Sequence, residues 1–221
     1  MTAMGLSRTY GDPCGVARSL DLVGERWALL IVRELLLGPK RFGDLLDGLA
    51  DASPNVVSQR LRELVQSGVV HRRALGPPTR IHLYELTPWG HELEPVILHL
   101  GRWGSRAPMP QRGTLGIDSL VLSLTAAFDP SRTQGARATY QLHIDDHVFV
   151  LELADGAVTA RRGSAPNPDA TITTNREALT AAVQGKRTLA DVLRTADLKV
   201  DGDQTASALA LASLLTPATS T

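Results

Sequence analysis

The sequence is short of several residue types, and each shortage excludes a class of protein. Its single cysteine, Cys14, has no second cysteine in the chain for a disulfide, which fits a reducing compartment. No apolar run is long enough to span a bilayer, and the first 13 residues lack the apolar centre of a signal peptide. We therefore expect a cytoplasmic protein with no membrane partner.

Aromatic residues and net charge are also scarce. Aromatic residues make up 4% of the 221, so the core must consist mainly of Leu, Val, Ile and Ala. Lys plus Arg and Asp plus Glu number 23 each, and this balance neither indicates nor excludes an anionic partner. The distribution of charge along the chain is therefore the useful observation.

A segment rich in Gly, Pro and Arg divides the chain. Residues 101–116, GRWGSRAPMPQRGTLG, have no periodic apolar pattern, which is typical of a linker. The length allows one large domain or two small ones. We predict a first domain over residues 1–104, a linker over 105–116 and a second domain over 117–221.

The first half is predicted to be mainly helical with one hairpin. Helices are expected over residues 16–23, 26–37, from about 42 onward, and 53–67. Strands over residues 69–75 and 80–87 flank a Gly-Pro-Pro-Thr tip, and a fifth helix is expected from Pro88 to about residue 103. Helices followed by a hairpin in this order predict a mainly α winged helix-turn-helix domain.

The fourth predicted helix separates into two faces. Ser53 suits the N-cap and Pro54 the first helical position, where its missing N–H costs nothing. One face is apolar and packs inward: Val57, Leu61, Leu64 and Val65. The other carries amide and guanidinium groups that match base edges in the major groove: Asn55, Gln59, Arg62 and Gln66, with Val56 beside them.

Basic charge is concentrated on this helix and the hairpin. Residues 53–80 hold five arginines and one acid, Glu63. We predict that Asn55, Gln59 and Arg62 contact bases, and that the DNA backbone is held by Ser58, Arg60, Arg72, Arg73 and Arg80. Ser53, Pro54, Val56 and Thr79 complete the predicted DNA-binding set. The alternative is that any amphipathic helix has a polar outer face, and the helix alone does not exclude it.

The same stretch resembles a known family. Residues 14–104 resemble the HxlR family of bacterial transcriptional regulators, within the MarR-like group. The resemblance rests on Cys14, the Gly24-x-Arg26-Trp27 and Arg41-Phe42 pairs, SQRL at 58–61 and LTPWG at 86–90. It implies a homodimer formed by the first and last helices, binding double-stranded DNA at a two-fold-symmetric operator. It also implies a repressor rather than an activator, and no catalytic residue.

Two interpretations of Cys14 stay open. In some HxlR relatives a cysteine near this position senses oxidants or electrophiles, which makes Cys14 a candidate redox residue. The alternative is a small apolar residue packed at the dimer interface.

The second half is predicted to be an α+β unit. Strands are expected over residues 139–144, 147–153, 157–162 and 169–174, and a short one over 198–200. Helices are expected over 176–183, 189–195 and 204–215, whereas residues 117–128 fit a helix or a strand equally. We find no internal repeat.

This half resembles the sterol-carrier-protein fold, in which a sheet and helices enclose an apolar tunnel. The most specific piece of the resemblance is DLKVDGD at residues 197–203. It implies a site for a small apolar ligand, with candidate lining residues Phe149, Leu151, Val183, Leu189, Val192, Leu193, Leu198 and Leu209. For any one of these residues, membership of an ordinary hydrophobic core is the simpler interpretation.

The sequence suggests no chemistry of catalysis. We find no His, Cys and acidic residues at metal-ligand spacing, no glycine-rich phosphate loop and no nucleophile motif, so we expect no metal, no cofactor and no enzyme. The function that fits best is a dimeric DNA-binding repressor whose affinity for DNA responds to an apolar or aromatic ligand. The alternative is a lipid or polyketide carrier that uses the winged helix to dimerise.

Overall fold

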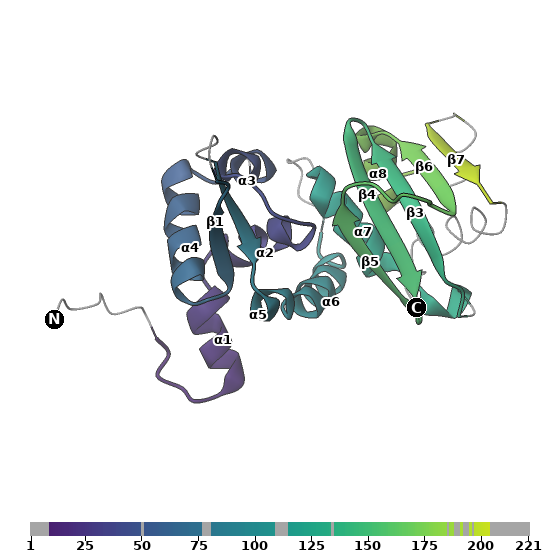
Figure 1. The fold of residues 1–221 in the computed structure, drawn as a ribbon. Helices are drawn as coiled ribbons and strands as arrows, with labels where there is room; N and C mark the ends of the chain where they lie inside the picture. Colours follow the sequence, from purple (N-terminus) through teal and green to yellow (C-terminus); the bar gives the residue numbers. More distant parts are fainter. Residues whose placement is uncertain are drawn as a thin grey trace. The chain divides into compact units, whose positions relative to one another are not determined.

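The computed structural model describes residues 9–49, 51–76, 81–108, 115–133, 135–184, 186–187, 191, 195 and 197–203. The chain divides into two compact units, Met1–Ile97 and Leu98–Thr221, and each is considered by itself. Figure 1 shows the helical first unit and the sheet of the second. Within the described residues, no helix is both long enough and apolar enough to cross a membrane.

The first unit contains helices and one hairpin. In chain order they are α1 (Gly15–Val23), α2 (Ala28–Leu36), α3 (Phe42–Gly48), α4 (Pro54–Gln66), β1 (Val70–Ala74), β2 (His82–Leu86) and α5 (Pro88–His91). Helix α6 (Glu94–Gly104) runs across the division between the units. This is the predicted winged helix-turn-helix order.

Two predicted helices have different bounds in the structure. Helix α2 begins at Ala28 rather than Arg26, because Trp27 has a left-handed backbone with φ of 78°. The helix expected from Pro88 to about residue 103 is broken into α5 and α6. At the break, Glu92 N donates to Trp89 O and Leu93 N to Gly90 O, so the turn tightens to i→i+3 bonds.

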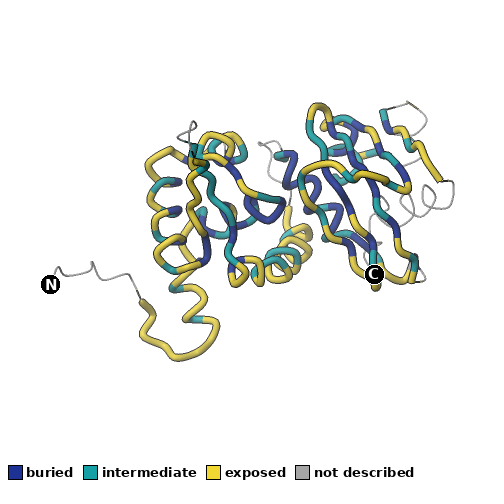
Figure 2. Tube along the Cα trace, viewed as in Figure 1, coloured by how far each residue is buried: buried dark blue, intermediate teal, exposed yellow. Residues whose placement is uncertain are grey.

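The core of the first unit lies between α2, α3 and α4, where the tube in Figure 2 is dark blue. It is made of aliphatic side chains, as the scarcity of aromatics required, and its fully buried members are Ile31, Val32, Leu35, Leu45, Val57, Leu61 and Leu64. Val65 was predicted to join them, but its side chain is 37% exposed. It lies one residue beyond Leu64, at the edge of the apolar stripe.

The hairpin is fixed to the helices by two local devices. The Thr87 hydroxyl accepts from Gly90 N at 3.0 Å and donates to Gly68 O at 2.8 Å, so one side chain joins the start of α5 to the end of α4. Gly90 lies against the backbone, and a Cβ there would be 2.2 Å from Val69 O. These contacts account for Thr87 and Gly90 in the LTPWG motif.

The second unit is an α+β arrangement. Its elements are α7 (Ile117–Ala127), a 3₁₀ turn η1 (Pro130–Arg132), β3 (Ala138–Ile144), β4 (His147–Ala154), β5 (Ala157–Arg162), β6 (Ala170–Thr174), α8 (Arg176–Val183) and β7 (Leu198–Gly202). The stretch that fitted a helix or a strand equally is therefore a helix, α7. The strands form one sheet in the order β5-β4-β3-β6-β7, in which β3 and β6 are parallel and the other neighbours antiparallel.

The two faces of this sheet are covered differently. Strand alternation and register place Tyr140, Phe149 and Arg162 on one face, and Asp118 of α7 bonds Arg162 there. Gln141 points to the opposite face and is nevertheless 5% exposed. Its amide donates to Phe149 O at 2.8 Å and accepts from Ala165 N at 2.8 Å. Gln141 thus holds the segment that leads from edge strand β5 across to β6.

The DLKVDGD motif at residues 197–203 has a structural explanation. Gly202 has φ of 133°, and a Cβ there would be 2.5 Å from Asp169 O. Asp203 N donates to that same oxygen at 3.0 Å, and the Asp169 carboxylate accepts from Thr139 N at 2.7 Å. The motif therefore closes the ends of β7, β6 and β3 around Asp169.

Three predicted features fall outside the described residues in whole or in part: the hairpin tip beyond Gly76, the helix over 189–195 and the helix over 204–215. The domain bounds 1–104, 105–116 and 117–221 stay a prediction.

Candidate nucleic-acid interface

Helix α4 carries the candidate base-contacting side chains, and its ends are formed as its sequence indicates. The Ser53 hydroxyl accepts from Val56 N at 3.4 Å, Pro54 takes the first turn, and Gly68 has φ of 77° after the last turn. Because Val57 and Leu61 are buried on one side, the opposite side of α4 is held outward.

The outward side contains the predicted base-contacting residues. Asn55, Val56, Gln59, Arg62 and Gln66 are all exposed, so the structure brings them together on one face. Amide and guanidinium groups at this spacing match the donors and acceptors of base edges. Their contact with DNA stays a prediction.

Three polar side chains on this face are joined in a chain of hydrogen bonds. Arg62 Nη2 donates to Gln59 Oε1 at 2.6 Å, and Gln59 Nε2 donates to Glu63 Oε1 at 2.7 Å. Glu63 entered the sequence argument only as the one acid in a basic stretch. Its role as an acceptor was missed, although the i, i+4 spacing from Gln59 was the signal for it.

Arg60 is placed differently from the other predicted contacts. Its Nη1 lies 2.5 Å from Glu63 Oε2 and 3.6 Å from Glu25 Oε2, and its side chain is 19% exposed. A guanidinium held between two carboxylates is a weaker candidate for a phosphate contact than the sequence suggested. Ser58, the other predicted backbone contact on α4, is half-buried.

On the hairpin, Arg72 and Arg73 are both exposed but differ in their partners. Arg73 Nε lies 3.2 Å from Glu85 Oε1 on the neighbouring strand, whereas the structure shows Arg72 in no ion pair with a described residue. Arg72 is therefore the stronger candidate for a phosphate contact. Exposed His71 on the same strand was not among the predicted residues. Thr79 and Arg80 lie outside the described residues.

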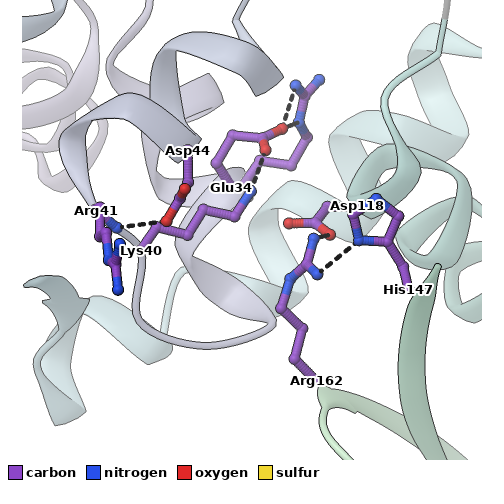
Figure 3. Close-up of polar contacts among 8 residues, drawn as sticks. Glu34, Lys40, Arg41, Asp44, Asp118, His147 and Arg162 are labelled. Atoms are coloured by element: carbon purple, nitrogen blue, oxygen red, sulfur yellow. Dashed lines mark hydrogen bonds and ion pairs between the residues drawn. The ribbon is translucent and has the colours of Figure 1, made fainter.

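A buried ion pair lies behind the helix-turn-helix. Glu34 of α2 accepts from Lys40 Nζ at 2.5 Å and from Arg33 Nη2 at 2.7 Å (Figure 3). Lys40 also exchanges backbone hydrogen bonds with Tyr84 of β2, at 3.0 and 2.8 Å. Gly48 of α3 leaves room for the carboxylate, since a Cβ there would be 2.3 Å from Glu34 Oε2. The pair thus connects α2, α3 and the hairpin that positions α4.

Cys14 is exposed at the N-cap position of α1. Its backbone N–H donates to Asp12 Oδ1 at 2.9 Å. Exposure is compatible with a redox role and with an interface role, so both interpretations stay predictions.

The candidate ligand-binding residues of the second unit divide into two groups. Phe149, Leu151 and Leu198 are buried in the sheet, and Val183 is half-buried at the end of α8. Leu189, Val192, Leu193 and Leu209 lie outside the described residues. Among the residues that are described, no group of three or more His, Cys, Asp or Glu is placed to hold a metal ion.

The comparisons with known proteins divide the chain in the same two parts. A family model described as HxlR-like helix-turn-helix matches residues 22–112. The HTH-type transcriptional regulator YdeP of Bacillus subtilis is 35% identical over 96 residues, which are 43% of this chain and 74% of the relative. The chain belongs to the HxlR-like helix-turn-helix family. The relatives that it matches are HTH-type transcriptional regulators.

Other HxlR-type relatives cover the same part of the chain. The HTH-type transcriptional regulator Rv3095 of Mycobacterium tuberculosis is 42% identical over 97 residues, and this chain spans 61% of its length. The solved structure of the redox regulator HypR in its oxidized form is 30% identical, covers 44% of this chain and 100% of that chain, and has a TM-score of 0.41.

A second family model, described as alkyl sulfatase C-terminal, matches residues 113–220. The solved sec-alkylsulfatase Pisa1 from Pseudomonas sp. is 24% identical over 48% of this chain and 17% of its own, with a TM-score of 0.40. Residues 113–220 are thus similar to that family model, and the structure shows an α+β arrangement in this unit. The sterol-carrier resemblance of this unit stays a prediction.

Proposed function

We propose that this HxlR-type regulator is a cytoplasmic homodimeric repressor that binds a two-fold-symmetric operator and releases it when a small apolar or aromatic ligand binds the second unit. It has no catalytic role in this proposal. The observation that carries it is the exposed polar face of α4, flanked by the exposed Arg72 of the hairpin.

Dimerisation is supported by exposed apolar side chains at helical spacing. On α1, Val16 is 68% exposed and Leu20 lies one turn further on. On α6, Val96, Leu100 and Trp103 are exposed, Trp103 by 65%. Apolar stripes of this kind are unusual on a monomer and mark interaction surfaces. A dimer places two copies of α4 about one DNA turn, roughly 34 Å, apart.

Ligand control is supported by the presence of a separate second unit with buried apolar side chains along its sheet. A ligand shifts the protein between two dimer shapes only as far as its affinities for those shapes differ. The alternative of a lipid or polyketide carrier uses the same unit, but it leaves the amide and arginine side chains of α4 without a role.

Selection from random DNA tests the DNA-binding proposal. The purified full-length protein is incubated with a random double-stranded library, and bound fragments are sequenced over several rounds. We expect enrichment of a palindromic motif with half-sites about 10 bp apart from centre to centre. Enrichment of no motif, or of one without symmetry, contradicts the proposal.

A pair of arginine variants supplies the control. Arg72→Ala on the hairpin is expected to weaken binding to all sequences and to lower the slope of log affinity against log salt by about 1. Arg161→Ala changes an exposed arginine of the second unit that pairs with Glu152 at 3.3 Å, and it is expected to leave that slope unchanged.

Native mass spectrometry of the protein tests the ligand proposal. A bound apolar molecule that lowers operator affinity when added back supports it. A co-purified molecule without any effect on DNA binding favours the carrier function instead.

A further inference from the structure

We propose that Arg62 recognises a guanine in each half-site of the operator, and that Gln59 and Glu63 position its guanidinium rather than contacting bases. This inference rests on the proposed DNA-binding function and names the base that α4 recognises.

The Gln59 amide makes two hydrogen bonds to side chains on α4. Both bonds of the Gln59 amide run toward the following turn, with Oε1 accepting from Arg62 and Nε2 donating to Glu63. The amide is therefore a bridge between a carboxylate and a guanidinium. Bonds to charged groups are about twice as strong as neutral ones, so the bridge is the preferred state of this amide.

Arg60 holds the Glu63 end of that bridge. The other Glu63 oxygen, Oε2, lies 2.5 Å from Arg60 Nη1. Arg60 in turn reaches Glu25 of the segment between α1 and α2, at 3.6 Å. Because Arg60 is mostly buried, it holds the Glu63 carboxylate in place, and the carboxylate holds the amide.

The bridge affects which bases Gln59 and Arg62 can recognise. Gln recognises adenine by using its amide oxygen and nitrogen together. Here each of these atoms is tethered to a neighbour on the helix, so the amide keeps one lone pair and one N–H and its orientation is set by Arg62 and Glu63. Arg62 has five N–H donors and gives one of its nitrogens to Gln59, so a pair of donors remains for O6 and N7 of guanine.

Arg62 differs from Arg60 and Arg73 in its charged neighbours. Arg60 and Arg73 each lie within 4 Å of a carboxylate, whereas the described residues place none beside Arg62. No carboxylate of the described residues neutralises its charge. An oriented and exposed guanidinium is the group that bidentate guanine recognition requires.

The test is the same selection, repeated with variants of the full-length protein. For the wild type we expect a guanine at one position of each half-site. Arg62→Ala and Arg62→Lys are both expected to reduce the preference for that guanine about 10-fold or more, because Lys cannot donate two parallel bonds. Asn55→Ala, on the same face of α4 but two turns earlier, is expected to leave that position unchanged.

The positioning residues have a different expected result. Gln59→Ala and Glu63→Ala are expected to keep the same preferred guanine and to weaken its preference by about 3-fold, within the range for one positioning bond. Circular dichroism of each variant checks that the exposed substitutions leave the fold intact.

Two failures are distinguishable. A wild type that selects no motif overturns the proposed function itself. A wild type that selects a palindrome, together with an Arg62→Ala variant that keeps every base preference, overturns only the assignment of Arg62. A Gln59→Ala variant that loses an adenine preference overturns the positioning role and makes Gln59 a base contact.

Discussion

Among the described residues, each unit of this protein buries one carboxylate, and the two are stabilised in different ways (Figure 3). Glu34 in the first unit is 2% exposed and bonds two cations, Lys40 and Arg33. Asp118 in the second unit bonds Arg162, whose guanidinium also lies 4.9 Å from the centre of the Phe149 ring. Of the two cations on Glu34, Lys40 is itself buried, whereas the Arg162 side chain is 32% exposed.

The difference shows what each carboxylate positions. The Glu34 pair lies among α2, α3 and the hairpin, and α2 and β1 both pack against α4. The Asp118 pair joins α7 to the edge strand β5 and is accessible to water on one side. Desolvated charges are costly when one partner is removed, and partly hydrated ones much less so. Stability in the first unit should therefore depend more strongly on its buried charge.

The largest expected effect is the loss of Glu34. Glu34→Ala leaves the buried Lys40 ammonium without this carboxylate, and we expect the free energy of unfolding of the first unit to fall by about 3–5 kcal/mol. Urea titration followed by tryptophan fluorescence measures it. The double variant Glu34→Leu/Lys40→Met, which removes both charges, is expected to recover most of the loss. A Glu34→Ala variant as stable as the wild type contradicts the comparison.

The next largest loss of stability is expected from replacing Gly202 in the second unit. Gly202→Ala would place a Cβ on a residue with φ of 133°, 2.5 Å from Asp169 O and 2.7 Å from Ala170 Cα. Both of these neighbouring atoms belong to the backbone. We expect a loss of about 2–3 kcal/mol in the second unit, at the upper range for strained backbone positions. Gly43→Ala is the matched control, because nothing lies within 4 Å of its Cβ, and it is expected to be neutral or slightly stabilising. Equal effects of the two substitutions would show that close approach is irrelevant.

Much of the first unit could be predicted from local signals. The Ser53-Pro54 start and the Gly68 end of α4 depend only on neighbouring residues, and they lie where the pattern indicated. Trp27 could not be predicted to interrupt the preceding helix, because nothing in a tryptophan side chain indicates a left-handed backbone.

The candidate interface was predicted less completely than the helix that carries it. The amphipathic pattern identifies Gln59 and Arg62 as outward residues, but it treats each as independent. Besides the nearby Glu63, Arg60 has Glu25 as a partner, and Arg73 has Glu85. Both Glu25 and Glu85 lie outside residues 53–80. Counting charges over residues 53–80 therefore overstated the free positive charge of this surface.

The third largest effect is expected at Gln141, which lies on the face of the second unit's sheet opposite Tyr140. Gln141→Leu keeps the volume but removes the amide that bonds Phe149 O and Ala165 N. We expect a loss of about 1–3 kcal/mol, because the buried backbone groups lose their partner. Hydrogen exchange is expected to accelerate at the Ala165 amide, and exposed Gln66→Ala in the first unit should change neither measurement. Unchanged exchange at Ala165 would contradict the role of Gln141.

The smallest expected effect at neutral pH is that of replacing Tyr140. Its side chain is buried, as Glu34 is, but it carries no charge at this pH. No described residue bonds its hydroxyl, so Tyr140→Phe is expected to be neutral or slightly stabilising near pH 8. Burial, and then the charge of Asp169, raise the pKa of Tyr140 from 10.0 to about 12. Between these values the folded protein keeps a proton that the unfolded chain releases.

The stability that comes from this protonated phenol is therefore complete below pH 10 and is lost as the pH rises toward about 12. Wild type should lose stability more steeply than Tyr140→Phe between about pH 10 and pH 12, since every other titrating group is common to both. Urea titrations of both proteins across this range measure the difference. Parallel curves would mean that the Tyr140 hydroxyl is hydrated in the folded protein, and the second unit would then bury no unsatisfied phenol.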